Sequence, residues 1–294
     1  MHNTTYIDSF KRYLSDERNA PTNTILSYTR DISQFADFLL SGEKTGFTDV
    51  TEDEVRSFLL KLEESGRSPA TVSRTLASLK AFFVHMADKG LIMVNPAAGI
   101  NGILVPKKPP RTLTSQEIER LLEQPDVRDP KGCRDRAMLE TLYATGIRVS
   151  ELVMLERSDV NLVTGLIVCR NGRERVIPIY AAAVKAIEVY LNTTREKIAL
   201  PEETALFVNT RGIRMSRQGF WKVLKSYAVK ARIKKDITPQ ILRNSFAAHL
   251  LENGADIRSL QEMLGHADIA STQVYARVVK QHLKDVYHKV HPKA

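Results

Sequence analysis

The chain has few of the residues that mark secreted, membrane-bound or metal-dependent proteins. Its 294 residues include two cysteines, Cys133 and Cys169, and their spacing matches no metal-ligand pattern. This excludes a disulfide scaffold, and a lone pair in a chain that begins without a secretion signal favours a reducing compartment, which we expect to be the cytoplasm. No apolar run approaches the roughly 18 residues that a membrane-spanning helix needs. No cluster of acids, or of cysteine and histidine, suggests a metal site, so we expect neither a metal nor another cofactor.

Acidic residues are also in the minority, and unevenly so. The net charge is +9, from 43 Lys and Arg against 34 Asp and Glu. Residues 1–106 hold 11 basic and 13 acidic side chains, whereas residues 107–294 hold 32 and 21, so the first part is near −2 and the second near +11. A basic excess of this size favours a polyanionic partner, either nucleic acid or an anionic membrane surface. A solvated basic surface without a partner is the plainer alternative.

The first hundred residues show the apolar spacing of helices. Stripes at steps of three and four residues, with a capping pair at Thr51 and Glu54 and the start signal Ser68-Pro69, predict four helices. Their expected ranges are 3–17, 21–42, 51–65 and 68–88. Four such helices bury one another as a small bundle, so these stripes are expected to be core.

A proline-rich basic segment then separates two domains. Three prolines and three basic residues within 105–111 predict a linker at 107–112, between a helical domain (1–106) and a second domain (113–294). The second domain is expected to be mixed, with helices at 134–145, 149–155, 180–198, 216–231 and 239–252. Between them, 166–168 and 176–179 predict a β-hairpin around a polar turn, 170–174, in which Asn171-Gly172 is a two-residue hairpin signal. Two short helices and a last helix carrying Leu283, Val286, Tyr287 and Val290 end the chain.

Four polar segments of the second domain could carry chemistry. Arg148 follows a glycine break, Arg243 lies in the first turns of a helix, His266 follows a glycine, and Tyr275 comes nine residues later. Two arginines can hold both non-bridging oxygens of one phosphate, because each offers a rigid fork of donors. Each residue also has a plainer interpretation, as a surface arginine, an ion-paired arginine, a turn histidine or a core tyrosine. Spacing alone does not decide between these.

Taken together, these segments resemble the tyrosine recombinase (phage-integrase) family, and within it the Xer-type recombinases that resolve chromosome dimers. The resemblance runs through 68–76, 144–152, 243–251 and 264–275 and reaches the closing His-Pro-Lys-Ala. It implies a mainly α fold with a small β-sheet (α+β), an N-terminal SAM-like four-helix core-binding domain and a C-terminal catalytic domain. By motif, Arg148 and Arg243 would bind the phosphate, His266 would assist, and Tyr275 would be the nucleophile.

Two positions depart from the family pattern. Gln240 stands where the family usually has histidine, and the hairpin turn has no lysine, Arg170 being the best positional match. Glutamine cannot exchange a proton at useful pH, and arginine holds its proton too firmly to protonate a leaving oxygen. Because acid–base assistance is typically worth about 10²–10⁴ in rate, we expect an intact phosphate clamp with slower chemistry. Gln240→His and Arg170→Lys should then raise the rate of cleavage.

The resemblance implies site-specific DNA recombination through a 3′-phosphotyrosyl intermediate, without ATP. The implied partners are a double-stranded DNA site and a tetramer on two duplexes, with identical protomers or a second Xer-type recombinase. Whether a DNA translocase activates the protein stays open. Whether it acts on the chromosome or on a mobile element stays open as well. Two alternatives remain: a DNA-binding protein that has lost the chemistry, and a relaxing enzyme like the type IB topoisomerases.

Overall fold

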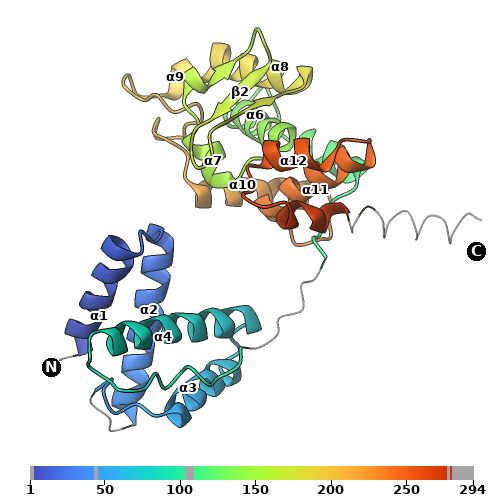
Figure 1. Ribbon diagram of the computed structural model, residues 1–294. Coiled ribbons are helices and arrows are strands. Elements are labelled where there is room, and N and C mark those ends of the chain that lie inside the picture. Colours follow the sequence, from blue (N-terminus) through green and yellow to red (C-terminus); the bar gives the residue numbers. More distant parts are fainter. Residues whose placement is uncertain (1–2, 43–45, 103–108, 277–278, 280–294) are drawn as a thin grey trace, which may run out of the picture. The chain divides into compact units, whose positions relative to one another are not determined.

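The computed structural model describes residues 3–42, 46–102, 109–276 and 279, and these divide into two compact units, Met1–Lys107 and Lys108–Ala294. The expected linker at 107–112 lies partly outside the described residues, and the expected last helix, with Leu283, Val286, Tyr287 and Val290, lies wholly outside them. Neither of those two predictions is tested by the structure. Each unit is described below by itself (Figure 1).

The first unit is helical, as the apolar stripes predict. Its helices are α1 (Asn3–Arg12), which continues as a π-helical turn η1 (Tyr13–Glu17), then α2 (Thr22–Ser41), α3 (Glu52–Glu64) and α4 (Pro69–Asp88). The capping box of Thr51 and Glu54 begins α3, and the Ser68 hydroxyl accepts from the backbone N–H of Thr71 at the start of α4. Helices α2 and α4 pack against each other (Figure 1). Their shared core is rich in phenylalanine, including Phe10, Phe35, Phe82 and Phe83, each completely buried.

The second unit joins helices to one small sheet. Its elements are α5 (Ser115–Leu122), α6 (Pro130–Thr145), α7 (Val149–Met154), η2 (Arg157–Asp159), β1 (Val160–Asn161), β2 (Leu166–Cys169), β3 (Arg175–Pro178), α8 (Ala181–Tyr190), η3 (Leu191–Arg195), α9 (Glu196–Ile198), α10 (Arg217–Lys230), α11 (Pro239–Glu252) and α12 (Ile257–Leu264). The expected helix at 180–198 is present but passes through the π-helical turn η3. A further helical stretch covers 270–276.

The sheet is an antiparallel meander in the order β1-β2-β3. The hairpin and its polar turn at 170–174 were predicted at the right place, but the turn is longer than the two-residue type that Asn171-Gly172 suggests. Cys169 pairs with Arg175, so five residues, 170–174, separate the strands. Gly172 adopts a left-handed φ of 94° within this longer turn, which explains why Asn171-Gly172 resembles a tight-turn signal. The third strand, β1, pairs Val160 with Ile167 and was not predicted.

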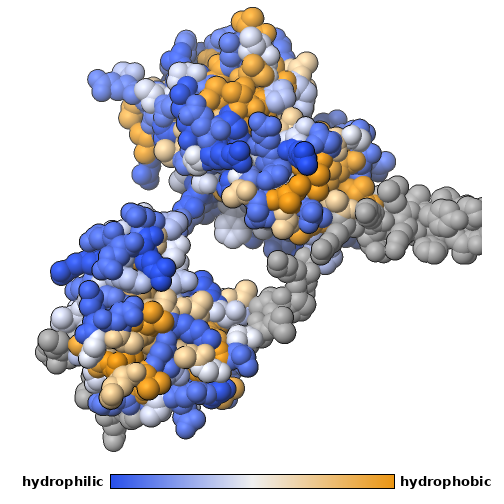
Figure 2. Space-filling model, viewed as in Figure 1, coloured by the Kyte–Doolittle hydropathy of each residue, from blue (hydrophilic) through white to orange (hydrophobic). Residues whose placement is uncertain are grey.

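Helix α6 is the centre of this unit. It packs against α8, α11, α7 and β3, and most of its residues are buried (Figure 1). This burial on all sides explains why α6 lacks a clear apolar stripe, since a helix covered all round needs no polar face. On the face seen in Figure 2, each unit mixes hydrophilic residues with apolar areas. Among the described residues no helix is long and apolar enough to cross a membrane.

Candidate active site

Arg148 is positioned by a glycine. Gly146 ends α6 in the left-handed conformation, with φ 59° and ψ 19°, and Arg148 becomes the N-terminal cap of α7 two residues later. A Cβ atom at Gly146 would lie 2.2 Å from the ring of Phe246 on α11, so a larger residue does not fit there. The side chain of Arg148 remains 46% exposed. The turn therefore presents an accessible guanidinium at a buried helix junction.

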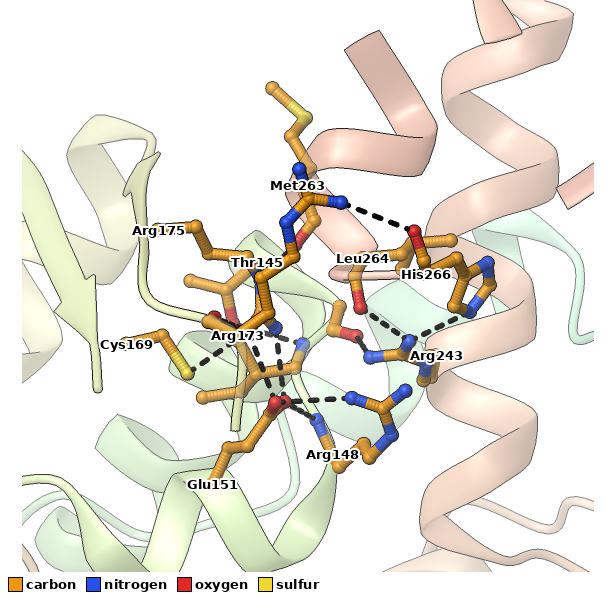
Figure 3. Close-up of polar contacts among 12 residues, drawn as sticks. Thr145, Arg148, Glu151, Cys169, Arg173, Arg175, Arg243, Met263, Leu264 and His266 are labelled. Atoms are coloured by element: carbon orange, nitrogen blue, oxygen red, sulfur yellow. Dashed lines mark hydrogen bonds and ion pairs between the residues drawn. The ribbon is translucent and has the colours of Figure 1, made fainter. Parts of the chain in front are cut away.

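Glu151, which the sequence did not single out, holds Arg148 and a second arginine. Its carboxylate is 3% exposed and accepts from the backbone N–H of Arg148 at 2.6 Å and from the Arg148 guanidinium at 3.1 Å. It also forms two hydrogen bonds of 3.0 Å with Arg175 (Figure 3). Burial by itself raises the pKa of Glu151, but the hydrogen bonds from Arg175 and Arg148 outweigh it and the pKa is lowered. Glu151 is therefore a stable anion that fixes both arginines.

Arg243 is buried with neutral partners. Its side chain comes from α11, and its two terminal nitrogens donate to the backbone oxygens of Gly146 and Leu264, each at 2.7 Å. The residue is 3% exposed, and among the described residues no carboxylate forms an ion pair with it. Burial, with the positive charge of Arg148, lowers the pKa of Arg243 to about 10. A buried guanidinium without its own anion is a site that favours an anionic ligand.

His266 contacts Arg243 directly. Its ring Nε2 lies 2.9 Å from an Arg243 nitrogen (Figure 3). Its Nδ1 lies 2.9 Å from the hydroxyl of Thr272. Since arginine can only donate, Nε2 accepts, and the ring proton is on Nδ1 and is donated to Thr272. Burial, with the charges of Arg243 and Arg148, lowers the pKa of His266 to about 4. His266 is therefore neutral at neutral pH in this arrangement.

Tyr275 lies beside this pair. It is 4% exposed, and its ring is nearly parallel to that of His266, with 15° between the planes and 6.4 Å between the centroids. Its hydroxyl donates to Asn244 Oδ1 at 3.1 Å. Burial raises the pKa of the Tyr275 phenol, although the charge of Arg243 acts in the opposite direction. Gln240 reaches the same acceptor, because its Nε2 donates to Asn244 Oδ1 at 2.9 Å.

The hairpin brings a different arginine to the site from the one expected. Arg170 turns away, and its Nε donates to Asp159 at 2.7 Å. Arg173, three residues later, extends to the backbone oxygen of His266 at 3.5 Å and is exposed (Figure 3). Arg175 is buried and donates to the backbone oxygen of Met263 at 2.7 Å, which ties the hairpin to the turn before His266. The structure thus brings together Arg148, Gln240, Arg243, His266 and Tyr275 but not Arg170.

Four residues of this cluster were missed from the sequence. Glu151 and Asn244 lie within the quoted motifs, one turn from Arg148 and next to Arg243, so helical spacing could have suggested Glu151. No local signal distinguishes Arg173 from Arg170, because the longer turn decides which of them faces inward. Thr272 was missed because its partner, His266, is separated from it by an irregular turn.

The cluster can bind an anion and place a phenol next to it. Two guanidiniums, an imidazole and a tyrosine hydroxyl converge from the α6–α7 junction, α11, the turn after α12 and the helical stretch 270–276. Among the described residues there is no group of three or more His, Cys, Asp or Glu side chains that could hold a metal ion. Planar donor forks of this kind match the oxygens of a phosphate group. The arrangement therefore fits a phosphodiester and a tyrosine nucleophile.

Comparisons with known proteins identify the family to which the chain belongs. Residues 111–282 match the Phage integrase family, and residues 7–90 match the Phage integrase N-terminal SAM-like domain. The chain belongs to the phage integrase (tyrosine recombinase) family, whose members are enzymes that cut and rejoin DNA. The fold class expected from the sequence, a mainly helical chain with a small sheet, is confirmed.

The similarity to Xer-type members covers nearly the whole chain. It is 41% identical to the tyrosine recombinase XerD of Oceanobacillus iheyensis over 293 residues, which is 98% of each chain. It is 43% identical to XerC of Roseiflexus castenholzii over 279 residues, 92% of this chain and 88% of the relative. The crystal structure of the XerA recombinase is 28% identical, with a TM-score of 0.56 and 99% coverage of both chains. XerH bound to a palindromic difH substrate, 23% identical, shares the fold with a TM-score of 0.76, covering 92% of this chain and 80% of that chain.

Proposed function

We propose that Tyr275 is the nucleophile of a site-specific recombination reaction on double-stranded DNA, and that Arg148 and Arg243 bind the scissile phosphate. The observation that carries this is Arg243, a buried guanidinium whose partners in the described part of the chain are all neutral, 2.9 Å from a histidine that lies against a tyrosine. An entering phosphate would supply the missing anion. It would also bring the phosphorus next to the only phenol of this cluster.

The reaction is a transesterification. The Tyr275 oxygen forms a bond to phosphorus, the bond from phosphorus to the 5′ oxygen breaks, the phenol loses its proton and the leaving 5′ oxygen gains one. The products are a 3′-phosphotyrosyl link and a 5′ hydroxyl, and a 5′ hydroxyl from a partner duplex reverses the step. Phosphodiester bonds are conserved in number, so the reaction needs no ATP.

His266 changes its role when phosphate arrives. In the structure its Nε2 accepts from Arg243. If Arg243 donates to a phosphate oxygen instead, Nε2 is released, and the negative charge nearby raises the pKa of the imidazole from about 4. The released nitrogen can then take up a proton or donate one to the phosphate.

Arg173 is the hairpin residue placed to meet the same phosphate. Its guanidinium is exposed and has one long contact, to the backbone oxygen of His266 at 3.5 Å. Arg170 forms an ion pair with the buried carboxylate of Asp159. Arg173 stabilises developing charge on the leaving side, but, as an arginine, it does not readily give up a proton.

The similarity to XerC and XerD over nearly the whole chain supports a role in resolving chromosome dimers in the cytoplasm. The working assembly under this proposal is four protomers on two duplexes, with a second Xer-type recombinase as one set of protomers and a DNA translocase as activator. Binding of a duplex is supported by neighbours of the same fold, such as XerH, which is bound to its difH substrate.

A suicide-substrate assay tests the chemistry. Nicked duplexes that cover candidate chromosomal sites are incubated with the full chain and separated on a denaturing gel. We expect a shifted covalent band that is absent with Tyr275→Phe. DNA binding without a covalent band on any such site would contradict the proposal and favour a binding-only protein. Relaxation of a supercoiled plasmid without a recombination site would favour a topoisomerase-like enzyme.

A further inference from the structure

One side chain, Asn244, connects the nucleophile to two other parts of the second unit. Its Oδ1 accepts from the Tyr275 hydroxyl at 3.1 Å and from Gln240 Nε2 at 2.9 Å. Its Nδ2 donates to the backbone oxygen of Arg111 at 3.1 Å. Asn244 is 7% exposed, so these three contacts satisfy a buried carboxamide. Asn244 follows Arg243 directly on α11, and hence an arginine of the phosphate clamp and the hydrogen-bond acceptor of the nucleophile lie on the same turn of helix.

The orientation of the carboxamide is fixed by Arg111. A backbone carbonyl can only accept, so the Asn244 nitrogen must face Arg111 and the oxygen must face Tyr275. The segment of Arg111 is itself held on α11, because the backbone N–H of Leu113 donates to the Ser245 hydroxyl at 2.8 Å. Turning the amide over would set its oxygen against the Arg111 backbone oxygen and lose that hydrogen bond. It follows that the Tyr275 hydroxyl is the donor in its bond with Asn244.

We infer that Asn244 is a positioning residue that holds Tyr275 in its protonated, unreactive form until the carboxamide is displaced. An amide oxygen accepts a hydrogen bond but does not take up the proton, so this contact stabilises the neutral phenol and not the phenolate that attacks phosphorus. Gln240, also a donor to Asn244 Oδ1, supports the same orientation. Tyr275 is thus held in position as a neutral phenol, which does not attack phosphorus.

The positive charges near Tyr275 favour its ionisation, in contrast to the contact with Asn244. Burial raises the pKa of the phenol, and it outweighs the charge and hydrogen bond of Arg243 on α11 and the charge of Arg148 at the start of α7, which lower it. His266 lies parallel to the ring and is neutral at neutral pH. These groups are unchanged by substitution at 244, so any change in the ionisation of Tyr275 can be assigned to the carboxamide.

A titration of Tyr275 without DNA tests the inference. The ultraviolet absorbance of tyrosinate is followed against pH in the full chain and in the same chain with Tyr275→Phe, and the difference isolates Tyr275 among the nine tyrosines. With Asn244→Ala the ionisation should move to lower pH, because the bond to the neutral form is lost. With Asn244→Asp it should move to higher pH, because a carboxylate is a stronger acceptor and carries a negative charge. Asn253→Ala is the matched control, since Asn253 ends the same helix and, within the described part of the chain, its amide donates only to the His249 backbone oxygen.

The expected change in the rate of adduct formation rests on the proposed function of Tyr275 as nucleophile, whereas the titration does not. On a suicide substrate near neutral pH, Asn244→Ala should form the covalent adduct about threefold to tenfold faster, the effect expected of one ordinary hydrogen bond. Unchanged ionisation of Tyr275 in both variants would overturn the inference, even if the wild-type chain cleaves DNA. If Asn244→Ala does not fold, the upward shift in Asn244→Asp decides, and its absence overturns the inference equally. Lack of an adduct in the wild type, with the two opposite shifts present, would instead count against the proposed function.

Discussion

Arg170 and Arg173 lie three positions apart on one turn, and their surroundings differ. The guanidinium of Arg170 is held by the buried Asp159, whereas that of Arg173 reaches the turn of His266. Motif position favours Arg170, because sequence spacing assumes a standard turn length. In the folded chain Arg173, and not Arg170, contacts the turn of His266.

Substitution at these two positions should therefore have unequal effects on chemistry. We expect Arg173→Ala to slow adduct formation by about tenfold to a hundredfold, because a charge-stabilising donor near the leaving oxygen is lost. Arg170→Ala should change the rate by less than about threefold and act mainly on stability, since its contribution is a half-exposed ion pair. Single-turnover cleavage at saturating DNA measures both. Equal losses, or a larger loss with Arg170→Ala, would return the role to Arg170.

The lowered pKa of His266 predicts that the stability of the folded chain depends on pH. Its folded pKa of about 4 lies below the ordinary value of 6.5, so between these values the unfolded chain binds a proton that the folded chain does not. Stability should therefore fall as the pH drops from about 6.5 towards 4, and this contribution should be constant above and below that window. Melting temperatures of the wild type and of His266→Gln across the window test it. The difference between the two should shrink towards acid, and a constant difference would contradict the assignment of a neutral, buried imidazole.

At the scale of elements, the helices were predictable because their signals are local. Apolar spacing and caps such as Thr51 and Ser68 define where helices begin, and the structure confirms these two starts. The hairpin turn was predicted at 170–174, where it lies, although Asn171-Gly172 by itself suggests a tighter turn. Strand β1 has two residues, too few for a pattern. Helical spacing could have suggested the contact of Glu151 with Arg148, but not its bonds to Arg175. The contacts of Asn244 with Arg111 and Tyr275 were equally hidden, because these partners are distant along the chain.

The junction of α6 and α7 should be sensitive to one methyl group. Gly146→Ala imposes a left-handed conformation on an L-residue, which costs about 1–2 kcal/mol, and its Cβ would overlap Phe246. We expect a lower melting temperature and, below that temperature, a loss of adduct larger than the unfolded fraction explains, because Arg148 is displaced. Gly254→Ala is the control, since Gly254 has φ 90° at the end of α11 but nothing within 4 Å of its Cβ. If both variants lose the same activity, displacement of Arg148 is not the cause.

At the scale of the whole molecule, the basic excess belongs to the second part of the chain, which also carries the phosphate clamp. Binding to DNA should weaken with salt by about 0.9 log units of affinity per log unit of salt for each neutralised phosphate. Arg148→Ala should reduce this slope by about one such contact. Arg128→Ala should leave it unchanged, because Arg128 is held by two side-chain hydrogen bonds to Asp126. Affinity measured over a salt series decides, and a slope that is flat in the wild type would contradict phosphate-directed binding.

The uneven charge also bears on how the two units can be studied. With about −2 on residues 1–106 and +11 on residues 107–294, the two parts have opposite net charge near neutral pH. Expressed as separate polypeptides, they would be expected to bind to ion-exchange resins of opposite sign. Mixing them and asking whether the acidic part co-elutes with the basic part would reveal any attraction between them. The same chromatography, repeated with a DNA duplex present, would report whether a duplex joins them.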